Sequence, residues 1–188
     1  MRVPRKRHEK IREKILQSAR VLFNRHGFNA VSIDDVMSEA GLTRGSFYSY
    51  FDSKTALYAQ AVSSVVCQKR DAATGQGQID AEQIVRDYLS VHHLEDIDGG
   101  CPMIGLPSDI SRTSQSVRQA FESALRLMIE VIEQDVRTRT EPDRNRILSI
   151  AALCVGGMVL ARSIDNRELA NELREAAMAT ALSLGNWQ

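Results

Sequence analysis

A short segment around residue 45 gathers side chains that can bind phosphate or read the edges of base pairs. Its cationic and hydroxyl-bearing residues are Thr43, Arg44, Ser46, Tyr48, Ser49, Tyr50 and Lys54. An arginine such as Arg44 can donate to O6 and N7 of guanine together. Ser46 and Ser49 are small and Gly45 has no side chain, so a helix here can come close to the bases. Hydroxyls and ammonium groups suit phosphate oxygens, and the segment therefore predicts a nucleic-acid contact.

The elements around this segment are suited to presenting it. Apolar residues at helical spacing predict a first helix that ends at Gly27. Ser32 begins a second helix, which stops at Gly41. Thr43 begins a third, short helix that runs to Tyr50, with Phe47 turned toward the core. A helix, a tight turn with glycine and a short helix form a helix-turn-helix, whose second helix enters the major groove.

The run from Gly41 to Leu57, GLTRGSFYSYFDSKTAL, resembles the DNA-binding signature of the TetR family of transcriptional regulators. The resemblance covers about residues 10–58, with Tyr50 where many members have histidine. It implies phosphate contacts from Thr43, Tyr48, Tyr50 and Lys54, and base contacts from Arg44, Ser46 and Ser49. It also implies a ligand-responsive homodimer, most simply a repressor, that binds a palindromic operator in double-stranded DNA and is released by a small-molecule inducer.

The charge distribution agrees with a nucleic-acid contact at one end of the chain. Lysine plus arginine and aspartate plus glutamate both number 24. Residues 1–58 nevertheless carry a net charge of +5 and residues 59–188 a net charge of −5. A basic module on an acidic body is expected when only the module meets phosphate. The Arg5-Lys6-Arg7 arm either adds DNA contacts or is a solvated charge run, and the sequence leaves both interpretations open.

The whole chain is expected to be all-α, with about nine helices and no strand-like alternation. A three-helix helix-turn-helix domain over residues 1–58 would precede a helical ligand-binding and dimerisation domain over 59–188. The later expected helices are 54–73, 80–93, 104–112, 114–138, 143–163 and 168–184.

Two of these helices are candidates for the dimer contact. Helix 143–163 is apolar nearly all round, so it must be covered on all sides, and Gly156 and Gly157 would allow close approach of another helix. Helix 168–184 carries an apolar stripe. We expect both to pair with their copies in a four-helix interface; burial of both in the core of one chain is the alternative.

The ligand pocket is less well specified by the sequence. Residues on the segments that line the cavity in the family are Tyr88, His92, Met103, Leu106, Phe121, Met128, Met158 and Arg162. Methionine and phenylalanine at these positions are also ordinary core residues. His92 and His93 beside Glu95 and Asp96 have no further ligand spacing that would indicate zinc, so no metal and no cofactor is expected.

The three cysteines form neither a disulfide framework nor a metal pattern, which suggests a reducing compartment. Cys101 follows two glycines and precedes proline, so it is a candidate redox sensor, since some TetR-type repressors sense oxidants through cysteine. An incidental buried thiol is the alternative. Cys67 and Cys154 lie on apolar helix faces.

Other classes of protein find less support. The apolar run 147–161 is about 15 residues, short for a membrane span, and no apolar signal core follows the basic N-terminus, so a cytoplasmic protein, nucleoid-associated when bound to its operator, is expected. No nucleophile elbow, phosphate loop or metal motif indicates an enzyme. A helical adaptor that uses its helix-turn-helix for protein contacts is the alternative function.

Overall fold

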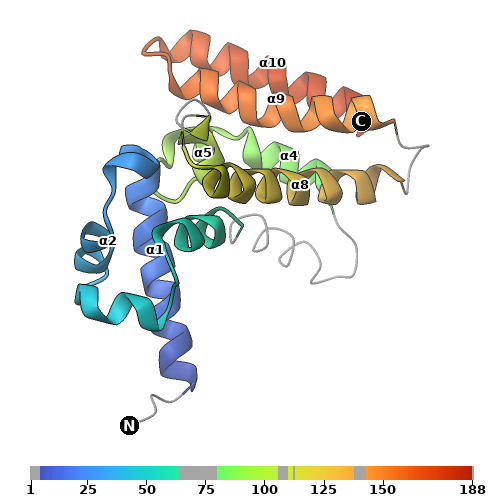
Figure 1. Cartoon of the computed structure of the whole chain (residues 1–188). Helices are drawn as coiled ribbons and strands as arrows, with labels where there is room; N and C mark the ends of the chain where they lie inside the picture. The colour runs from blue at the N-terminus through green and yellow to red at the C-terminus, as the bar shows by residue number, and fades with distance from the viewer. Residues whose placement is uncertain (1–4, 64–79, 106–109, 112, 138–142, 188) are drawn as a thin grey trace.

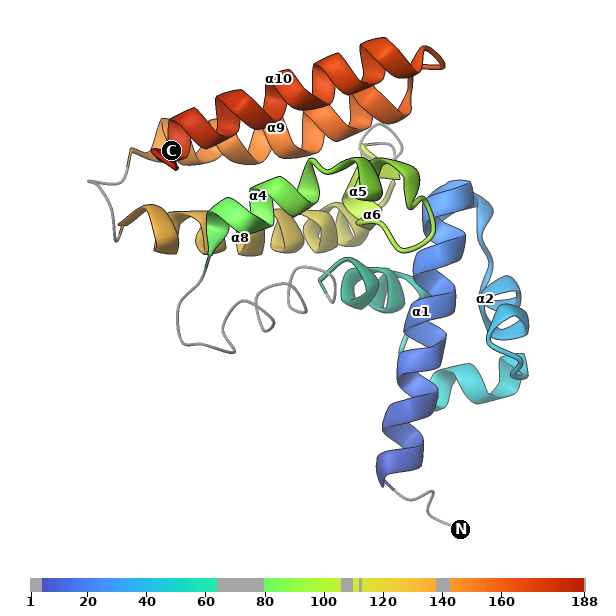
Figure 2. The same ribbon diagram turned by 180° about the vertical axis from the view of Figure 1, so that it is seen from behind.

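The computed structural model describes residues 5–63, 80–105, 110–111, 113–137 and 143–187. These residues form helices and connecting turns, with no strand among them. A smaller N-terminal group of helices lies at one end of the molecule and a larger helical body at the other (Figures 1 and 2). The expected all-α class is therefore confirmed.

The N-terminal group comprises α1 (Arg5–Ala30), α2 (Ile33–Glu39), the 3-10 helix η1 (Arg44–Ser49) and a helical segment that begins at 54 and is described to 63. Gly27 interrupts α1 with a φ of 78°, which is the predicted helix end. The aromatic rings of Phe23, Phe28 and Tyr58 contact one another edge-on or tilted, at centroid distances of 5.3–5.9 Å. This cluster fixes α1 to the segment 54–63.

The body contains α4 (Ala81–Tyr88), α5 (Val91–Glu95), α6 (Pro102–Gly105), α8 (Gln115–Arg137), α9 (Arg144–Arg162) and α10 (Arg167–Gly185). Helices α9 and α10 form a hairpin that lies over α4 and α8 (Figures 1 and 2). Gly157 is where the hairpin is tightest, because a Cβ at this position would come within 2.6 Å of the Ala177 Cβ. The indole Nε1 of Trp187 donates to Asp135 on α8 at 2.8 Å and fastens the end of the chain to the body.

Three expected elements differ in detail. The helix expected over 80–93 is divided into α4 and α5, because Leu89 ends α4 and the Ser90 hydroxyl accepts from the His93 N–H to cap α5. The helix expected over 104–112 is α6, which begins earlier, at Pro102, and residues 106–109 and 112 lie outside the described residues. The expected helix 54–73 is present to residue 63, beyond which it also lies outside them.

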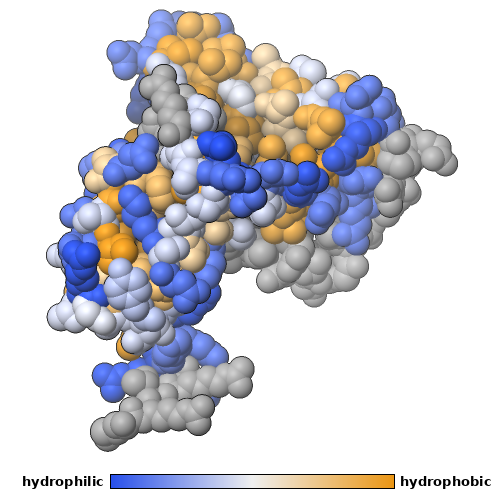
Figure 3. Space-filling view, viewed as in Figure 1, coloured by the Kyte–Doolittle hydropathy of each residue, from blue (hydrophilic) through white to orange (hydrophobic). Residues whose placement is uncertain are grey.

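Helix α9 is apolar enough, by length and composition, to cross a membrane, the one such helix among the described residues. The apolar run 147–161 alone is too short for a membrane span, whereas the whole helix is long enough. One face of α9 packs against the rest of the chain, with Ile147, Cys154 and Met158 fully buried. The opposite face is uncovered in the single chain: Leu148 is 40% exposed and Leu160 is 54% exposed. Apolar surface gathers over these upper helices in Figure 3.

Candidate nucleic-acid interface

The helix before the turn is fixed in place by its first residues. The Ser32 hydroxyl accepts from the backbone N–H of Asp35 at 3.1 Å, and the Asp35 carboxylate accepts from the Ser32 backbone N–H at 2.8 Å. This reciprocal capping box pairs two backbone donors at the start of α2. The hydrogen bonds from the Ser32 hydroxyl and backbone lower the pKa of Asp35. Gly41, with a φ of 64°, then turns the chain toward η1.

The short helix η1 separates an anchoring residue from an outward surface. Phe47 is 0% exposed and packs against the Phe51 ring at 5.9 Å. The neighbouring Tyr48 is 62% exposed. Thr43, Arg44, Gly45 and Ser49 are exposed, and Ser46 and Tyr50 are half-buried. One apolar contact thus places the other side chains of η1 at the surface, as the helix-turn-helix pattern predicts.

Gly45 is not required by the packing of this chain. A Cβ built at Gly45 meets nothing within 4 Å, and its backbone needs no positive φ. The space beside Gly45 is therefore open to solvent, on the outward side of η1. A missing side chain there allows a ligand to approach the backbone of η1 closely.

Arg44 has a partner before it meets any ligand. Its Nη1 lies 2.6 Å from Oδ2 of Asp34, and the two side chains are 62% and 54% exposed. An exposed ion pair of this kind contributes about 0–1 kcal/mol. The ion pair is therefore weak, and a guanine edge or a phosphate can replace Asp34 as the partner of the Arg44 guanidinium.

The ammonium of Lys54 points to backbone carbonyls and not outward, where a phosphate-binding residue would point. Its ammonium donates to the carbonyl oxygens of Phe28 at 2.9 Å and Val31 at 2.8 Å, and lies 4.3 Å from the Phe28 ring centroid. Burial lowers the pKa of Lys54. These contacts satisfy carbonyls after the break in α1 and tie this turn to the segment 54–63. In this geometry Lys54 holds the domain together.

His8 on α1 is a residue that the sequence argument missed. Its ring stacks on Tyr50 with centroids 4.5 Å apart, and its Nε2 lies 3.2 Å from the carbonyl oxygen of Ser49. A lone histidine in a charged run, 41 residues before Ser49, carries no signal of this contact in the sequence. Lys6 and Arg7, on the same end of α1, are exposed.

The expected pocket residues lie in different surroundings among the residues that the structure describes. Tyr88, Met103, Met128 and Met158 are buried in the body core. His92 is exposed, whereas its neighbour His93 is buried, and Leu106 lies outside the described residues.

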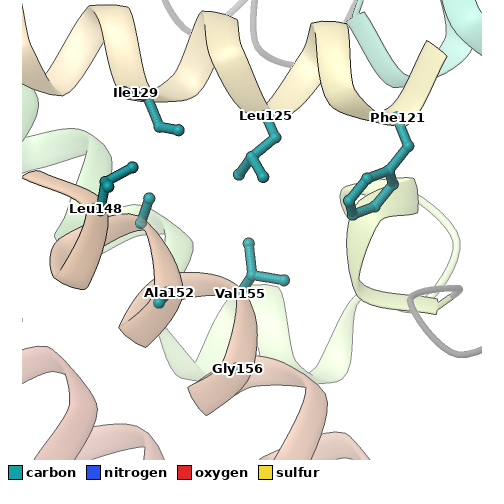
Figure 4. A pocket seen from close by; sticks show the side chains of 8 residues that line it. Phe121, Leu125, Ile129, Leu148, Ala152, Val155 and Gly156 are labelled. Carbon is teal, nitrogen blue, oxygen red and sulfur yellow. The ribbon is translucent and has the colours of Figure 1, made fainter. Parts of the chain in front are cut away.

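Phe121 lines an open apolar groove of about 310 Å³ between α8 and α9 (Figure 4). The groove is completed by residues that were not expected there: Leu125, Ile129, Leu148, Ala151, Ala152, Val155 and Gly156.

A polar layer joins the body to α1. Asn24 on α1 donates to the Gly100 carbonyl at 2.9 Å, and Arg20 donates to the Gly99 carbonyl at 3.3 Å. On the other side of the same loop, Arg162 of α9 donates to the carbonyls of His93 and Asp96. The loop 96–100 is therefore held by α1 and by α9 together.

Cys101 lies directly behind this loop and is 1% exposed. Its backbone N–H donates to Nε2 of His93 at 3.1 Å, and Nδ1 of His93 donates to the Tyr88 carbonyl at 2.7 Å. Burial, with the nearby Cys101 thiol, raises the pKa of the Tyr88 hydroxyl. Among the described residues no three histidine, cysteine or acidic side chains gather as a metal site would require.

An outward-facing recognition helix, braced by a capped helix and carried on an all-helical body, defines a helix-turn-helix protein. Residues 15–61 match the model of the bacterial regulatory proteins of the tetR family. The N-terminal part of the chain is therefore similar to the DNA-binding domain of the TetR family of transcriptional regulators.

Curated relatives match this chain over different shares of its length. The TetC protein of transposon Tn10 from Escherichia coli is 33% identical over 84 residues, which are 41% of this chain and 42% of TetC. IcaR from Staphylococcus aureus strain Newman, a negative transcriptional regulator of the biofilm operon icaADBC, is 33% identical over 52 residues, 28% of each chain. The chain thus spans less than half the length of these relatives.

The fold similarity extends over nearly the whole chain. The reduced form of NemR from Escherichia coli superposes with a TM-score of 0.72 at 21% sequence identity, covering 93% of this chain and 97% of NemR. At this identity the likeness shows a shared fold of the N-terminal group of helices, called the head below, and of the helical body.

Proposed function

We propose that this protein is a ligand-responsive transcriptional repressor, acting in the cytoplasm, that binds a palindromic operator as a homodimer and is released by a small molecule. The observation that carries the DNA-binding part is η1: Phe47 is fully buried while Arg44, Tyr48 and Ser49 face outward. The role of IcaR as a negative transcriptional regulator supports repression. We propose residues 1–58 as the DNA-binding domain and 59–188 as the ligand-binding and dimerisation domain.

The proposed contacts divide by chemistry. Arg44, Ser46 and Ser49 read base edges, with Gly45 permitting close approach. Thr43, Tyr48 and Tyr50 bind phosphate, and Lys54 supports them by fastening the domain. Because two heads must reach successive major grooves, the half-sites of the operator should be about 34–36 Å apart.

Selection of bound fragments from a random DNA pool, at two salt concentrations, tests this proposal. An enriched palindrome whose affinity falls steeply with salt is the expected result, since bound phosphates release counterions. The variant Arg44→Ala should relax the sequence preference at one position of each half-site. If no sequence is enriched and the affinity for DNA does not depend on salt, the adaptor function replaces DNA binding.

The proposed dimer uses the uncovered apolar faces of α9 and α10. Leu160 on α9 and Leu169 on α10 are 54% and 45% exposed, and contact with a second hairpin would remove them from water. Analytical ultracentrifugation at micromolar protein should show a dimer of the 21.0 kDa chain. Leu160→Glu should shift it to monomer, whereas Ile97→Glu, at a loop residue that is 52% exposed, should not. A monomeric wild-type protein would refute the dimer.

The proposed inducer is apolar and binds between α8 and α9. The groove there has almost entirely apolar walls, and α9 also carries Arg162, which holds the loop 96–100 against α1. A ligand that displaces α9 therefore has a direct connection to the DNA-binding domain. The probe 1-anilinonaphthalene-8-sulfonate should bind the wild type and should lose affinity in Ala152→Trp. Ser149→Trp, on the same helix outside the groove, is the control; equal binding in both variants would contradict this site.

Cys101 remains a proposal as a redox sensor. At 1% exposure it can react only when the loop 96–100 opens. If oxidation of Cys101 releases DNA, Cys101→Ser should bind DNA equally well before and after hydrogen peroxide treatment while the wild type loses binding. If Cys101→Ser loses DNA binding after hydrogen peroxide treatment as the wild type does, Cys101 is not the sensor.

A further inference from the structure

The contact between His8 and the end of η1 joins the N-terminal helix to the recognition segment. The imidazole stacks on Tyr50 at 4.5 Å. Its Nε2 lies 3.2 Å from the Ser49 carbonyl oxygen. A carbonyl oxygen can only accept, so Nε2 carries the hydrogen. The ring is half-buried, which leaves part of it at the surface beside the exposed Ser49 and near Lys6 and Arg7.

This tautomer makes the other ring nitrogen sensitive to protonation. In the neutral ring Nδ1 is an acceptor, which repels a phosphate oxygen. In the protonated ring Nδ1 is a donor with a positive charge, which attracts it. The Nε2 contact to Ser49 survives in both states. Protonation of His8 therefore adds a charged donor to the half-buried ring without breaking the contact that holds it.

We propose that His8 is a phosphate-binding residue of the DNA interface, and that the protein takes up a proton at His8 when it binds DNA. The inference rests on the proposed DNA-binding function and deepens it. Histidine changes charge between about pH 5 and 8, and a neighbouring phosphate favours the charged ring. Because the complex holds more protons than the separate partners, DNA affinity must rise as the pH falls through this range.

Other ionisable groups lie on the elements that carry His8 and Tyr50. On α1 they are Arg7, Glu9 and Arg12, and the Arg12 guanidinium lies 5.3 Å from the Phe51 ring. On the segment that follows η1 they are the Tyr50 phenol and the Asp52 carboxylate. Arginine, carboxylate and phenol groups ordinarily titrate well outside pH 6–8. A pH dependence in this window that His8→Gln abolishes therefore identifies His8.

The experiment measures binding of the full-length protein to a fluorescein-labelled 30-base-pair duplex, by anisotropy, between pH 6 and pH 8 and at several salt concentrations. The duplex carries the palindrome selected above or, failing one, a random sequence. Wild-type affinity should rise by about tenfold toward pH 6. This is the change expected when the pKa of one histidine rises by one on binding DNA. The slope of log affinity against log salt should steepen by about 0.9 for each added phosphate contact.

Two variants separate His8 from other histidines. His8→Gln retains a hydrogen-bond donor but cannot be charged, so it should lose the most affinity relative to the wild type near pH 6 and its pH dependence should vanish. His26→Gln, at an exposed histidine elsewhere on α1, should keep the full pH dependence. A role confined to packing against Tyr50 would alter affinity equally at all pH values and leave the salt slope unchanged.

Three outcomes would overturn the inference. Salt-dependent binding that is independent of pH overturns it while leaving the proposed function intact. A pH dependence that persists in His8→Gln assigns proton uptake to another group. Absence of salt-dependent binding at every pH overturns the proposed function, and the inference with it.

Discussion

Arg44 and Arg162 show how differently the two regions of this molecule use the same side chain. Arg44, in the head, is 62% exposed and pairs with the exposed carboxylate of Asp34. Arg162, in the body, is half-buried and donates to the backbone carbonyls of His93 and Asp96. Burial lowers the pKa of Arg162. The first cation can exchange its partner for DNA at little cost, whereas the second cannot leave without exposing unpaired carbonyls.

The same contrast extends to the surroundings of each arginine. The head presents hydroxyls, a glycine and a cation around one buried anchor, Phe47. In the body, the backbone carbonyls of the loop 96–100 accept hydrogen bonds from side chains of both α1 and α9. The proposed DNA-binding surface keeps its polar groups weakly engaged, whereas the junction between α1 and the body keeps its polar groups hydrogen-bonded. The following substitutions test this division.

The largest effect is expected at the anchor of η1. Phe47→Ala should lower the free energy of unfolding by about 3–5 kcal/mol, because a fully buried ring is replaced by a cavity. Urea denaturation followed by circular dichroism measures it. Tyr48→Ala, at the exposed neighbour, should change stability by less than about 0.5 kcal/mol while weakening DNA binding. Equal destabilisation by both would mean that η1 has no distinct inner and outer side.

The next effect is expected at the junction. Arg162→Met should lower the free energy of unfolding by about 2 kcal/mol, since two part-buried carbonyls lose a charged donor. Arg44→Met is the matched control in the head: its stability should be unchanged and its operator affinity reduced. The comparison between the regions fails if chemical denaturation shows Arg162→Met to be as stable as the wild type.

A smaller loss is expected at the capping box. Ser32→Ala should cost about 1 kcal/mol of stability, because a backbone donor of α2 loses its partner. Ser38→Ala, at an exposed serine of the same helix, should be nearly neutral in thermal unfolding.

The capping box also predicts a pH dependence. The pKa of Asp35 is lower in the folded chain, so its contribution to stability is present above the unfolded pKa and is lost as the pH falls through the folded pKa. The difference in stability between wild type and Ser32→Ala should therefore shrink under acid conditions below about pH 4. A difference that stays constant down to pH 2 would contradict the assigned hydrogen bonds.

The smallest effect is expected at the exposed ion pair. Asp34→Asn should leave stability unchanged and should tighten DNA binding about two- to fivefold, because it frees Arg44 and removes a negative charge near phosphate. Fluorescence anisotropy at low salt measures this gain. Glu39→Gln, on the same helix, controls for charge alone. Weaker binding in Asp34→Asn would show that the ion pair orients Arg44 for recognition.

Most of the head could be predicted from the sequence. The break at Gly27, the cap at Ser32, the turn at Gly41 and the burial of Phe47 each depend on residues within a few positions. Short-range rules of capping, glycine conformation and periodicity are sufficient for such features. The division of 80–93 at Ser90 was missed because an apolar pattern continues across a serine that can also cap a helix.

What only the tertiary structure decided are the contacts between distant residues. Lys54 bonds carbonyls 23 and 26 residues away, Asn24 bonds a carbonyl 76 residues away, and His8 reaches Ser49 across 41 residues. Local propensities say nothing about these pairs, because their geometry depends on how whole helices pack. The sequence by itself determined which residues form the recognition helix, and the packing of α1 determined which other side chains stand beside it.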